Sequence, residues 1–242
     1  AHPKVVAAIT EQAQKIISVP EMFYNDTRAA LLEKLTSLAP EGMDRAFLSN
    51  SGTEAVEAAF KFARFSTKRT GIIATMRGFH GRSMGALSAT WNKKYRSPFQ
   101  PLIPGIKHVP YNKLDRLDAA IDENTAAVIL EAVQGEGGVY PGDAEYLLGA
   151  QELCKERGAL LIMDEIQTGF GRTGKMFAVN HYDLKPDIMT IAKSMAGGVP
   201  MGATLLSERV AELSKGIHGS TFGGNPLAAA ASLAALNALV DE

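Results

Sequence analysis

The stretch Asp187–Ala203, DIMTIAKSMAGGVPMGA, decides the fold class of this chain. Its first part, Ile188–Ala192, is almost entirely apolar and predicts a strand that is covered on both faces. A second apolar run follows at Met201–Ser207. Between them stands Lys193, where the first run stops. A lysine beside buried apolar surface either extends its ammonium to water or is held for chemistry, and these residues alone leave both possibilities open.

Similar runs recur along the chain and alternate with helical patterns. Strands are predicted over Arg45–Ser49, Gly71–Thr75, Ala127–Glu131 and Ala159–Asp164, and helices over Thr53–Thr67, Ala144–Arg157 and Pro226–Val240. This alternation predicts an α/β fold with three layers, in which a mainly parallel sheet carries helices on both faces. We expect Trp91–Tyr111, with four prolines and three lysines, to form a surface insertion.

Composition excludes several classes of protein. The 242 residues suit one large domain or two small ones, and a net charge of -1 argues against nucleic acid and acidic lipid as partners. The single cysteine, Cys154, excludes an intrachain disulfide, and five scattered histidines argue against a metal site. No apolar run is long enough for a membrane span, so we expect a cytoplasmic protein.

Charged residues stand at the ends of three predicted strands. Glu131 ends one apolar run, Asp164 ends another, and Lys193 ends a third. Ligands of open parallel sheets bind beyond the carboxyl ends of the strands. A single strand-end carboxylate is usually an ordinary loop residue, but three such groups at one predicted edge favour a site.

A candidate phosphate-binding site lies at Ser51-Gly52-Thr53, between a predicted strand and a predicted helix. The N–H groups of a helix start, two hydroxyls and a glycine suit a phosphate, although Ser51 and Glu54 also have the spacing of a plain capping box. No GxxxxGK[ST] motif is present, so a nucleoside triphosphate is not indicated. Pyridoxal 5'-phosphate needs all three groups together: a lysine for its aldehyde, a carboxylate for its ring nitrogen and hydrogen-bond donors for its phosphate.

Six motifs carry a resemblance to a known family. In chain order they are SNSGTEAVEAA, GFHGRSMGALSAT, EAVQGEGGV, LLIMDEIQTGFGRTGK, PDIMTIAKSMAGGVPMGA and HGSTFGGNPLAAAA. They resemble the large domain of class III (fold-type I) aminotransferases, and most closely the acetylornithine aminotransferase group. The resemblance implies that residues 1–242 form the large domain that binds pyridoxal phosphate. It also implies a fragment that lacks the extreme N-terminal arm and the small C-terminal domain.

The resemblance implies roles for the residues around the cofactor. Lys193 would bond to the cofactor aldehyde and move the proton, and Asp164 would pair with the ring nitrogen while Glu131 supports it. Gln167 would contact the phenolic oxygen, and Phe79 would stack on the ring. Ser51, Gly52 and Thr53 would hold the phosphate.

The resemblance also implies substrate contacts and a partner. Arg82 would bind the substrate carboxylate, and Glu136 and Tyr24 resemble substrate-side residues, with loop packing or a solvated charge as an equal alternative. Thr221 resembles a residue that reaches the phosphate bound by the other subunit, which implies a homodimer with shared active sites. Ala132 stands where the family pattern has proline, a departure that leaves the matching acids in place. Val56 stands where many acetylornithine enzymes have asparagine, which leaves the substrate subgroup open.

The implied reaction moves the terminal amino group of an N-acetylornithine-like acylated diamino acid to 2-oxoglutarate, giving a semialdehyde and glutamate. Alternatives within the class act on an acetyl-lysine or aminoadipate semialdehyde, on ornithine, or on 4-aminobutyrate. Two rivals from other classes are a catalytically incomplete module that only binds the cofactor and a nucleotide-binding α/β protein. The incomplete module predicts a yellow protein whose absorbance does not change when glutamate is added. The nucleotide-binding protein predicts no imine band and no borohydride-trapped adduct on Lys193.

Overall fold

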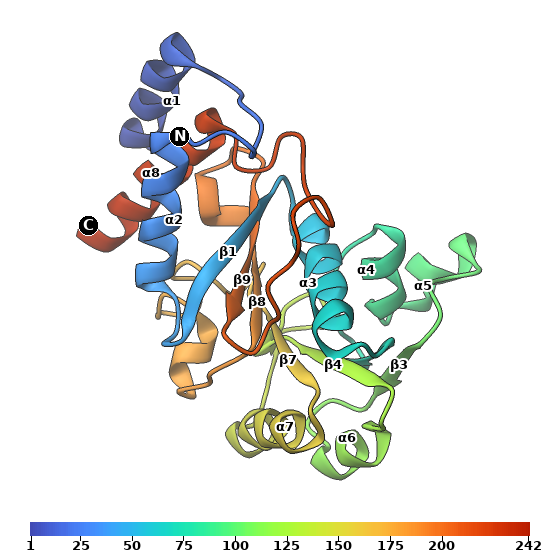
Figure 1. Cartoon of the computed structure of the whole chain (residues 1–242). Coiled ribbons are helices and arrows are strands. Elements are labelled where there is room, and N and C mark those ends of the chain that lie inside the picture. The colour runs from blue at the N-terminus through green and yellow to red at the C-terminus, as the bar shows by residue number, and fades with distance from the viewer.

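A seven-stranded sheet forms the centre of the molecule in the computed structural model, which describes residues 1–242 (Figure 1). Its strand order is β1-β9-β8-β7-β4-β2-β3. Four neighbouring pairs, from β8 to β3, are parallel, and the two pairs that involve β9 are antiparallel. The strands are β1 (Met43–Ser49), β2 (Gly71–Thr75), β3 (Ile106–Val109), β4 (Thr125–Leu130), β7 (Leu160–Asp164), β8 (Ile188–Ile191) and β9 (Gly202–Ser207).

The central strands are apolar on both faces because both faces are covered. Alternate side chains of a strand point to opposite sides. In β4, Val128 and Leu130 belong to the larger core cluster, whereas Ala127 and Ile129 belong to the smaller one on the other face. The continuous apolar runs in the sequence are therefore two alternating sets of core residues, one for each face.

Helices form the outer two layers. One face is covered by α3 (Gly52–Thr67) and α4 (Met84–Ala89), whose apolar residues belong to the smaller cluster. The other face is covered by α2 (Asp26–Leu38), α6 (Leu114–Ala120), α7 (Ala144–Arg157) and α8 (Pro226–Asp241), and α1 (Pro3–Lys15) packs on α8 (Figure 1). The predicted three-layer α/β fold with a mainly parallel sheet is confirmed.

Short elements complete the chain. A two-stranded ribbon pairs β5 (Val133–Gln134) with β6 (Tyr140–Pro141). The helical turns are α5 (Lys93–Arg96), η1 (Ser97–Phe99), η2 (Ala178–His181) and η3 (Lys193–Ala196). None of the helices combines the length and the apolarity that a membrane crossing requires.

The segment Trp91–Tyr111 is only partly the surface insertion that its composition predicts. Its first half holds α5 and η1, which project from the body in Figure 1. Its second half forms β3, the edge strand that pairs in parallel with β2. An edge strand pairs on one side only, so four residues, among them the exposed Lys107, are enough to form β3. So short a strand shows little of the apolar periodicity by which a strand is predicted from sequence.

The fold collects one end of each strand at a common edge. The carboxyl ends of β2, β4, β7 and β8 point the same way because these strands are parallel. The carboxyl end of β1 joins them, since β1 and β8 are both antiparallel to β9. The loops that follow these five ends therefore meet in one place, beside the start of α3.

Candidate active site

A cavity of about 350 Å³ opens at this common edge. Loops after β1, β2, β4, β7 and β8 all contribute to its wall, as the topology requires. Nine of the residues selected from the sequence line it: Ser51, Gly52, Thr53, Phe79, Glu131, Glu136, Asp164, Gln167 and Lys193. Side chains that are far apart in sequence thus face one space.

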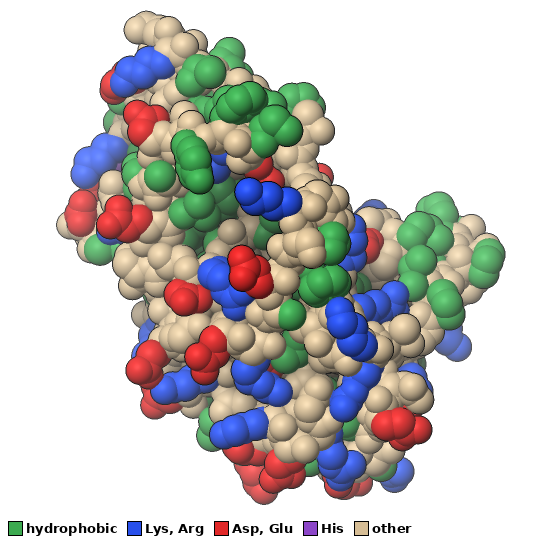
Figure 2. All heavy atoms as spheres, in the orientation of Figure 1, with side chains coloured by type: hydrophobic (Ala, Val, Ile, Leu, Met, Phe, Trp, Pro, Cys, Tyr) green, Lys and Arg blue, Asp and Glu red, His purple; other side chains and the backbone are tan.

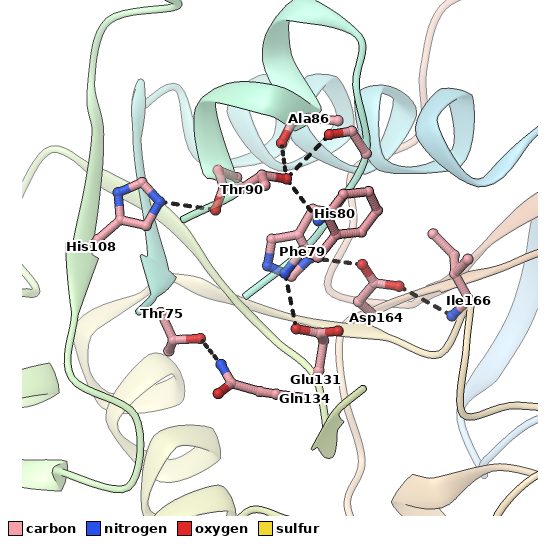
Figure 3. Close-up of polar contacts among 12 residues, drawn as sticks. Thr75, Phe79, His80, Ala86, Thr90, His108, Glu131, Gln134, Asp164 and Ile166 are labelled. Atoms are coloured by element: carbon pink, nitrogen blue, oxygen red, sulfur yellow. Dashed lines mark hydrogen bonds and ion pairs between the residues drawn. The ribbon is translucent and has the colours of Figure 1, made fainter. Parts of the chain in front are cut away.

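Asp164 is held in a fixed position at the end of β7. His80 Nδ1 lies 2.7 Å from its Oδ2, and the backbone N–H of Ile166 donates to its Oδ1 over 3.1 Å (Figure 3). Both side chains are buried, with exposed fractions of 0% for His80 and 4% for Asp164. Since a carboxylate only accepts, the His80 proton on Nδ1 points at Asp164.

The pair lies in a dry environment. Burial by itself lowers the pKa of His80, but the hydrogen bond and charge of Asp164, together with the charge of Glu131, outweigh burial and leave the pKa raised. A protonated His80 stabilises a carboxylate at position 164. The second ring nitrogen, Nε2, is buried and has no hydrogen-bond partner.

Glu131 follows β4 directly and is also buried. Its Oε2 accepts the backbone N–H of Phe79 over 3.2 Å (Figure 3). Burial raises its pKa to about 7, the nearby Asp164 adds to the rise, and the charge of His80 opposes it. The hydrogen bonds of Asp164 come from His80 and the Ile166 N–H, while Glu131 fixes the loop that carries Phe79. The expected support of Asp164 by Glu131 stays a prediction.

Lys193 begins η3, with a single residue between it and the end of β8, in a strained backbone conformation. Its φ of 48° lies in the left-handed region, which residues with a side chain seldom adopt. Strain of this kind persists where the surrounding structure enforces it, commonly at functional sites. The side chain is exposed to the cavity, and its ammonium forms no hydrogen bond or ion pair within the chain.

The start of α3 presents free donors to the same cavity. Ser51 caps the helix, accepting the N–H of Glu54 over 3.3 Å, while the Glu54 carboxylate accepts the N–H of Asn50 over 2.8 Å. The capping reading of this motif therefore holds in part. The N–H groups of Gly52 and Thr53 have no partner in the chain, as is usual in a first helical turn. They remain available to an anion.

The Thr53 hydroxyl is already engaged. Ser83 Oγ donates to Glu57 over 2.5 Å, so its contact of 2.7 Å with Thr53 Oγ1 uses the Thr53 proton. The backbone N–H of Ser83 also donates to Thr53 Oγ1 over 3.2 Å. Thr53 therefore offers its backbone N–H to the cavity, whereas its side chain ties α3 to the start of α4.

Glycines keep the cavity open at two close approaches. A Cβ on Gly135 would lie 1.6 Å from Gln167 Oε1, and a Cβ on Gly52 would lie 2.9 Å from the side chain of Ile166. Only residues without a side chain let Gln167 and Ile166 reach the cavity wall where they stand.

Three selected residues lie outside the cavity wall. Arg82 is exposed, and its guanidinium carbon is 4.8 Å from the centre of the Tyr95 ring. Tyr24 is fully exposed, and Thr221 is exposed in the loop before α8. The expected roles of these residues need a substrate or a second subunit, so they stay predictions.

His80 is a candidate residue that the sequence motifs did not single out for a role. It follows Phe79 directly in GFHGR, and no spacing rule connects it to Asp164 across 84 positions. Glu165, next to Asp164, was not selected and does not line the cavity. Its buried carboxylate accepts the N–H of Val179 and the hydroxyl of Thr168, which anchors the loop after β7.

The residues present fit pyridoxal 5'-phosphate. A buried carboxylate with both oxygens fixed can face a protonated ring nitrogen, and two free N–H groups at a helix start suit a phosphate. A lysine without a partner, Lys193, can reach an aldehyde in the same cavity. The donor set has no group of three or more side chains that could hold a metal ion.

The known proteins that this chain resembles are aminotransferases, the class of enzyme that these side chains suit. The family model described as "Aminotransferase class-III" matches residues 1–242. An acetylornithine aminotransferase from Methanopyrus kandleri is 50% identical over all of this chain and 62% of its own length. A [LysW]-aminoadipate semialdehyde transaminase from Deinococcus radiodurans is 52% identical over all of this chain and 57% of its own length. The chain thus spans about 60% of the length of these curated relatives.

A solved structure shares the fold. The taurine:2-oxoglutarate aminotransferase from Bifidobacterium kashiwanohense, in complex with PLP and glutamate, superimposes with a TM-score of 0.94 at 31% identity. The match covers 99% of this chain and 60% of that one. By its motifs, its fold and these matches, the chain belongs to the class III aminotransferases.

Proposed function

We propose that residues 1–242 form the cofactor-binding large domain of a pyridoxal-phosphate-dependent aminotransferase. In this proposal the enzyme moves the terminal amino group of an acylated diamino acid to 2-oxoglutarate. The observation that carries it is the convergence, in one cavity, of an unpaired lysine on strained backbone and a buried, hydrogen-bonded aspartate. The PLP and glutamate bound to the Bifidobacterium relative support the cofactor and the second substrate.

Different residues of the chain would orient the cofactor and move the proton. Bound pyridoxal phosphate would supply an aldehyde that condenses with amines and a protonated ring that withdraws electrons. Asp164, oriented by His80 and the Ile166 N–H, would hold the positive charge on the ring nitrogen. Lys193 Nζ would accept a proton from the amine-bearing carbon of the substrate and return it later.

Other residues would bind and orient. The N–H groups of Gly52 and Thr53 would hold the phosphate, with Ser51 setting the start of the helix. Phe79 would cover one ring face, and Gln167 would contact the phenolic oxygen. On the substrate side, Arg82, Glu136 and Tyr24 are proposed contacts, and Thr221 would serve the cavity of a second copy in a homodimer.

Two substrates have specific support. N-acetylornithine, as amine donor, is favoured by the 50% identity to the Methanopyrus acetylornithine aminotransferase. A [LysW]-aminoadipate semialdehyde, whose aldehyde would accept the amino group, is the second candidate, because the Deinococcus relative, at 52% identity, is a [LysW]-aminoadipate semialdehyde transaminase. Identities this close do not separate the two, so the substrate must be measured.

The test uses the visible spectrum of the purified chain after loading with pyridoxal phosphate. N-acetylornithine, N-acetyllysine, ornithine, 4-aminobutyrate and glutamate are added separately, and the loss of the imine band is followed. We expect a band that fades with glutamate and with an acylated diamino acid. A band that survives every donor would leave only a cofactor-binding module, and the absence of any band would reject the proposal.

A further inference from the structure

We infer that Asn50 couples cofactor binding in the two copies of the proposed homodimer, because it connects the phosphate site of its own cavity to the loop that carries Thr221. The inference rests on the proposed function, in which Thr221 serves the cavity of a second copy. It adds that a cofactor bound in one copy strengthens the binding of a cofactor in the other. The proposed function itself gives Asn50 no role.

Asn50 stands between the end of β1 and the start of α3, and it lines the cofactor cavity. Its Nδ2 donates to Ser220 Oγ over 3.1 Å and to Glu54 Oε2 over 3.0 Å, and its backbone N–H donates to the same Glu54 oxygen over 2.8 Å. Glu54 lies in the first turn of α3, which also holds the free N–H groups of Gly52 and Thr53. One side chain thus joins the helix start to the loop before α8.

Ser220 is the residue through which this contact reaches Thr221. Its Oγ also accepts the backbone N–H of Gly223 over 3.0 Å, so the hydroxyl closes a turn around Thr221 and Phe222. Both of these residues are exposed, Phe222 by 60%. An exposed phenylalanine beside an exposed threonine, on a turn that is hydrogen-bonded at its base, suits contact with a second protein surface.

The loop is attached to the body of the molecule on both sides of this turn. After the turn, a Cβ on Gly223 would lie 2.3 Å from the carbonyl oxygen of Leu48, so the backbone there rests on β1. Before the turn, the His218 ring packs on Phe47 and Phe62, with centroid distances of 4.6 and 5.4 Å. A short exposed segment between two attached points therefore remains to be held in place.

The surface on which the loop packs is basic. Lys61 Nζ lies 2.8 Å from His218 Nδ1, and burial together with this charge lowers the pKa of His218, so its ring packs in the neutral form. The chain has no aspartate or glutamate between Glu57 and Asp115. Figure 2 shows Lys and Arg side chains gathered beside and below α3, with few acids among them. Their summed potential favours an anion such as phosphate at the start of this helix.

The binding of phosphate supplies the free energy for the coupling. A helix start with unsatisfied N–H groups is loosely held, and an anion bound to those groups orders it. An ordered first turn fixes Glu54 and, with it, the Asn50 side chain that holds the loop. Less conformational entropy is then lost when Thr221 binds the phosphate in the second copy. By reciprocity, Thr221 bound in the second copy favours cofactor binding in the first.

The experiment titrates the chain with pyridoxal phosphate, follows the imine band, and uses a chain concentration at which sedimentation shows a dimer. We expect positive cooperativity in the wild type, with a Hill coefficient of about 1.5. Asn50→Ala and Ser220→Ala should each lower the coefficient to about 1, whereas Ser220→Thr, which keeps the hydroxyl, should preserve cooperativity. Ser214→Ala, at an exposed position of the same loop, is the matched control and should also stay cooperative. A purely structural role of Asn50 would weaken binding without changing the Hill coefficient.

The outcomes separate the inference from the proposed function. An imine band that forms without cooperativity in the wild type, or cooperativity that survives in Asn50→Ala and Ser220→Ala, would overturn the coupling and leave the cofactor assignment in place. A chain that stays monomeric when loaded would overturn the coupling too, because no second cavity is then served. If no imine band forms at any concentration of cofactor, the proposed function fails and the inference fails with it.

Discussion

At the scale of single residues, the site depends on a chain of buried polar contacts. His80 orients Asp164, Glu131 fixes the backbone of Phe79, and neither contact involves neighbours in sequence. The place of Lys193 and Asp164 in the cavity wall could be predicted because each stands where an apolar run ends. The partners could not, since a hydrogen bond across 84 positions depends on how separate loops meet.

Asp164→Asn tests the charge at the ring nitrogen. The amide keeps an oxygen for the Ile166 N–H but has no negative charge, so the affinity for pyridoxal phosphate should fall about tenfold or more. Glu165→Gln is the matched control, because Glu165 is an adjacent buried acid that does not line the cavity. Cofactor titration by fluorescence measures both, and equal affinities in the two variants would contradict the role of Asp164.

Glu131→Gln tests the raised pKa of a buried acid. The pKa is about 7 in the folded chain and 4.5 as the ordinary value, so the unfolded chain loses this proton first as pH rises. Glu131 therefore lowers the unfolding free energy of the wild type progressively as pH rises from about 4.5 to about 7, and the loss remains above pH 7. Relative to wild type, the variant without cofactor should gain of the order of 2 kcal/mol in unfolding free energy from pH 5 to 8. Urea unfolding measures this, and a difference independent of pH would refute it.

At the scale of elements, connection lengths determine most of the topology. Ten residues separate the end of β8 at Ile191 from the start of β9 at Gly202, too few for a parallel crossover, so β9 runs antiparallel. The longer helical connections elsewhere give parallel strands. The strand β3 was missed because a four-residue edge strand in a proline-rich segment has almost no pattern.

A buried arginine joins three elements near the N-terminus. Arg28, in the first turn of α2, donates to the carbonyls of Val19, Phe23 and Gly224 over 2.7, 3.0 and 2.8 Å. Arg28→Met leaves these three carbonyls without that donor and should lower the unfolding free energy by about 3 kcal/mol.

The control for this variant is Arg116→Met, which alters an exposed ion pair with Asp115 and should cost less than about 0.5 kcal/mol. Urea unfolding at one pH compares the two. Equal losses of unfolding free energy in the two variants would show that water can replace the guanidinium at the three carbonyls. The buried guanidinium would then not be required to hold the segment before α2 against the loop before α8.

At the scale of the whole molecule, the parallel sheet explains why a site exists where it does. Five strands end at one edge, and the loops after them bring Lys193, Asp164 and the start of α3 to a single cavity. The layer order and this edge could be predicted from apolar periodicity. The distribution of charge could not be judged from the net value of -1, which conceals an acid-free segment of basic residues.

Chemical trapping tests whether Lys193 is the residue that bonds to the cofactor. The chain is loaded with pyridoxal phosphate, reduced with borohydride, digested and mapped by mass spectrometry, with Lys193→Ala as control. We expect one phosphopyridoxyl group, on the peptide that contains Lys193, and none on that peptide in the variant. A stable adduct on another lysine, or equal labelling of both proteins, would contradict it.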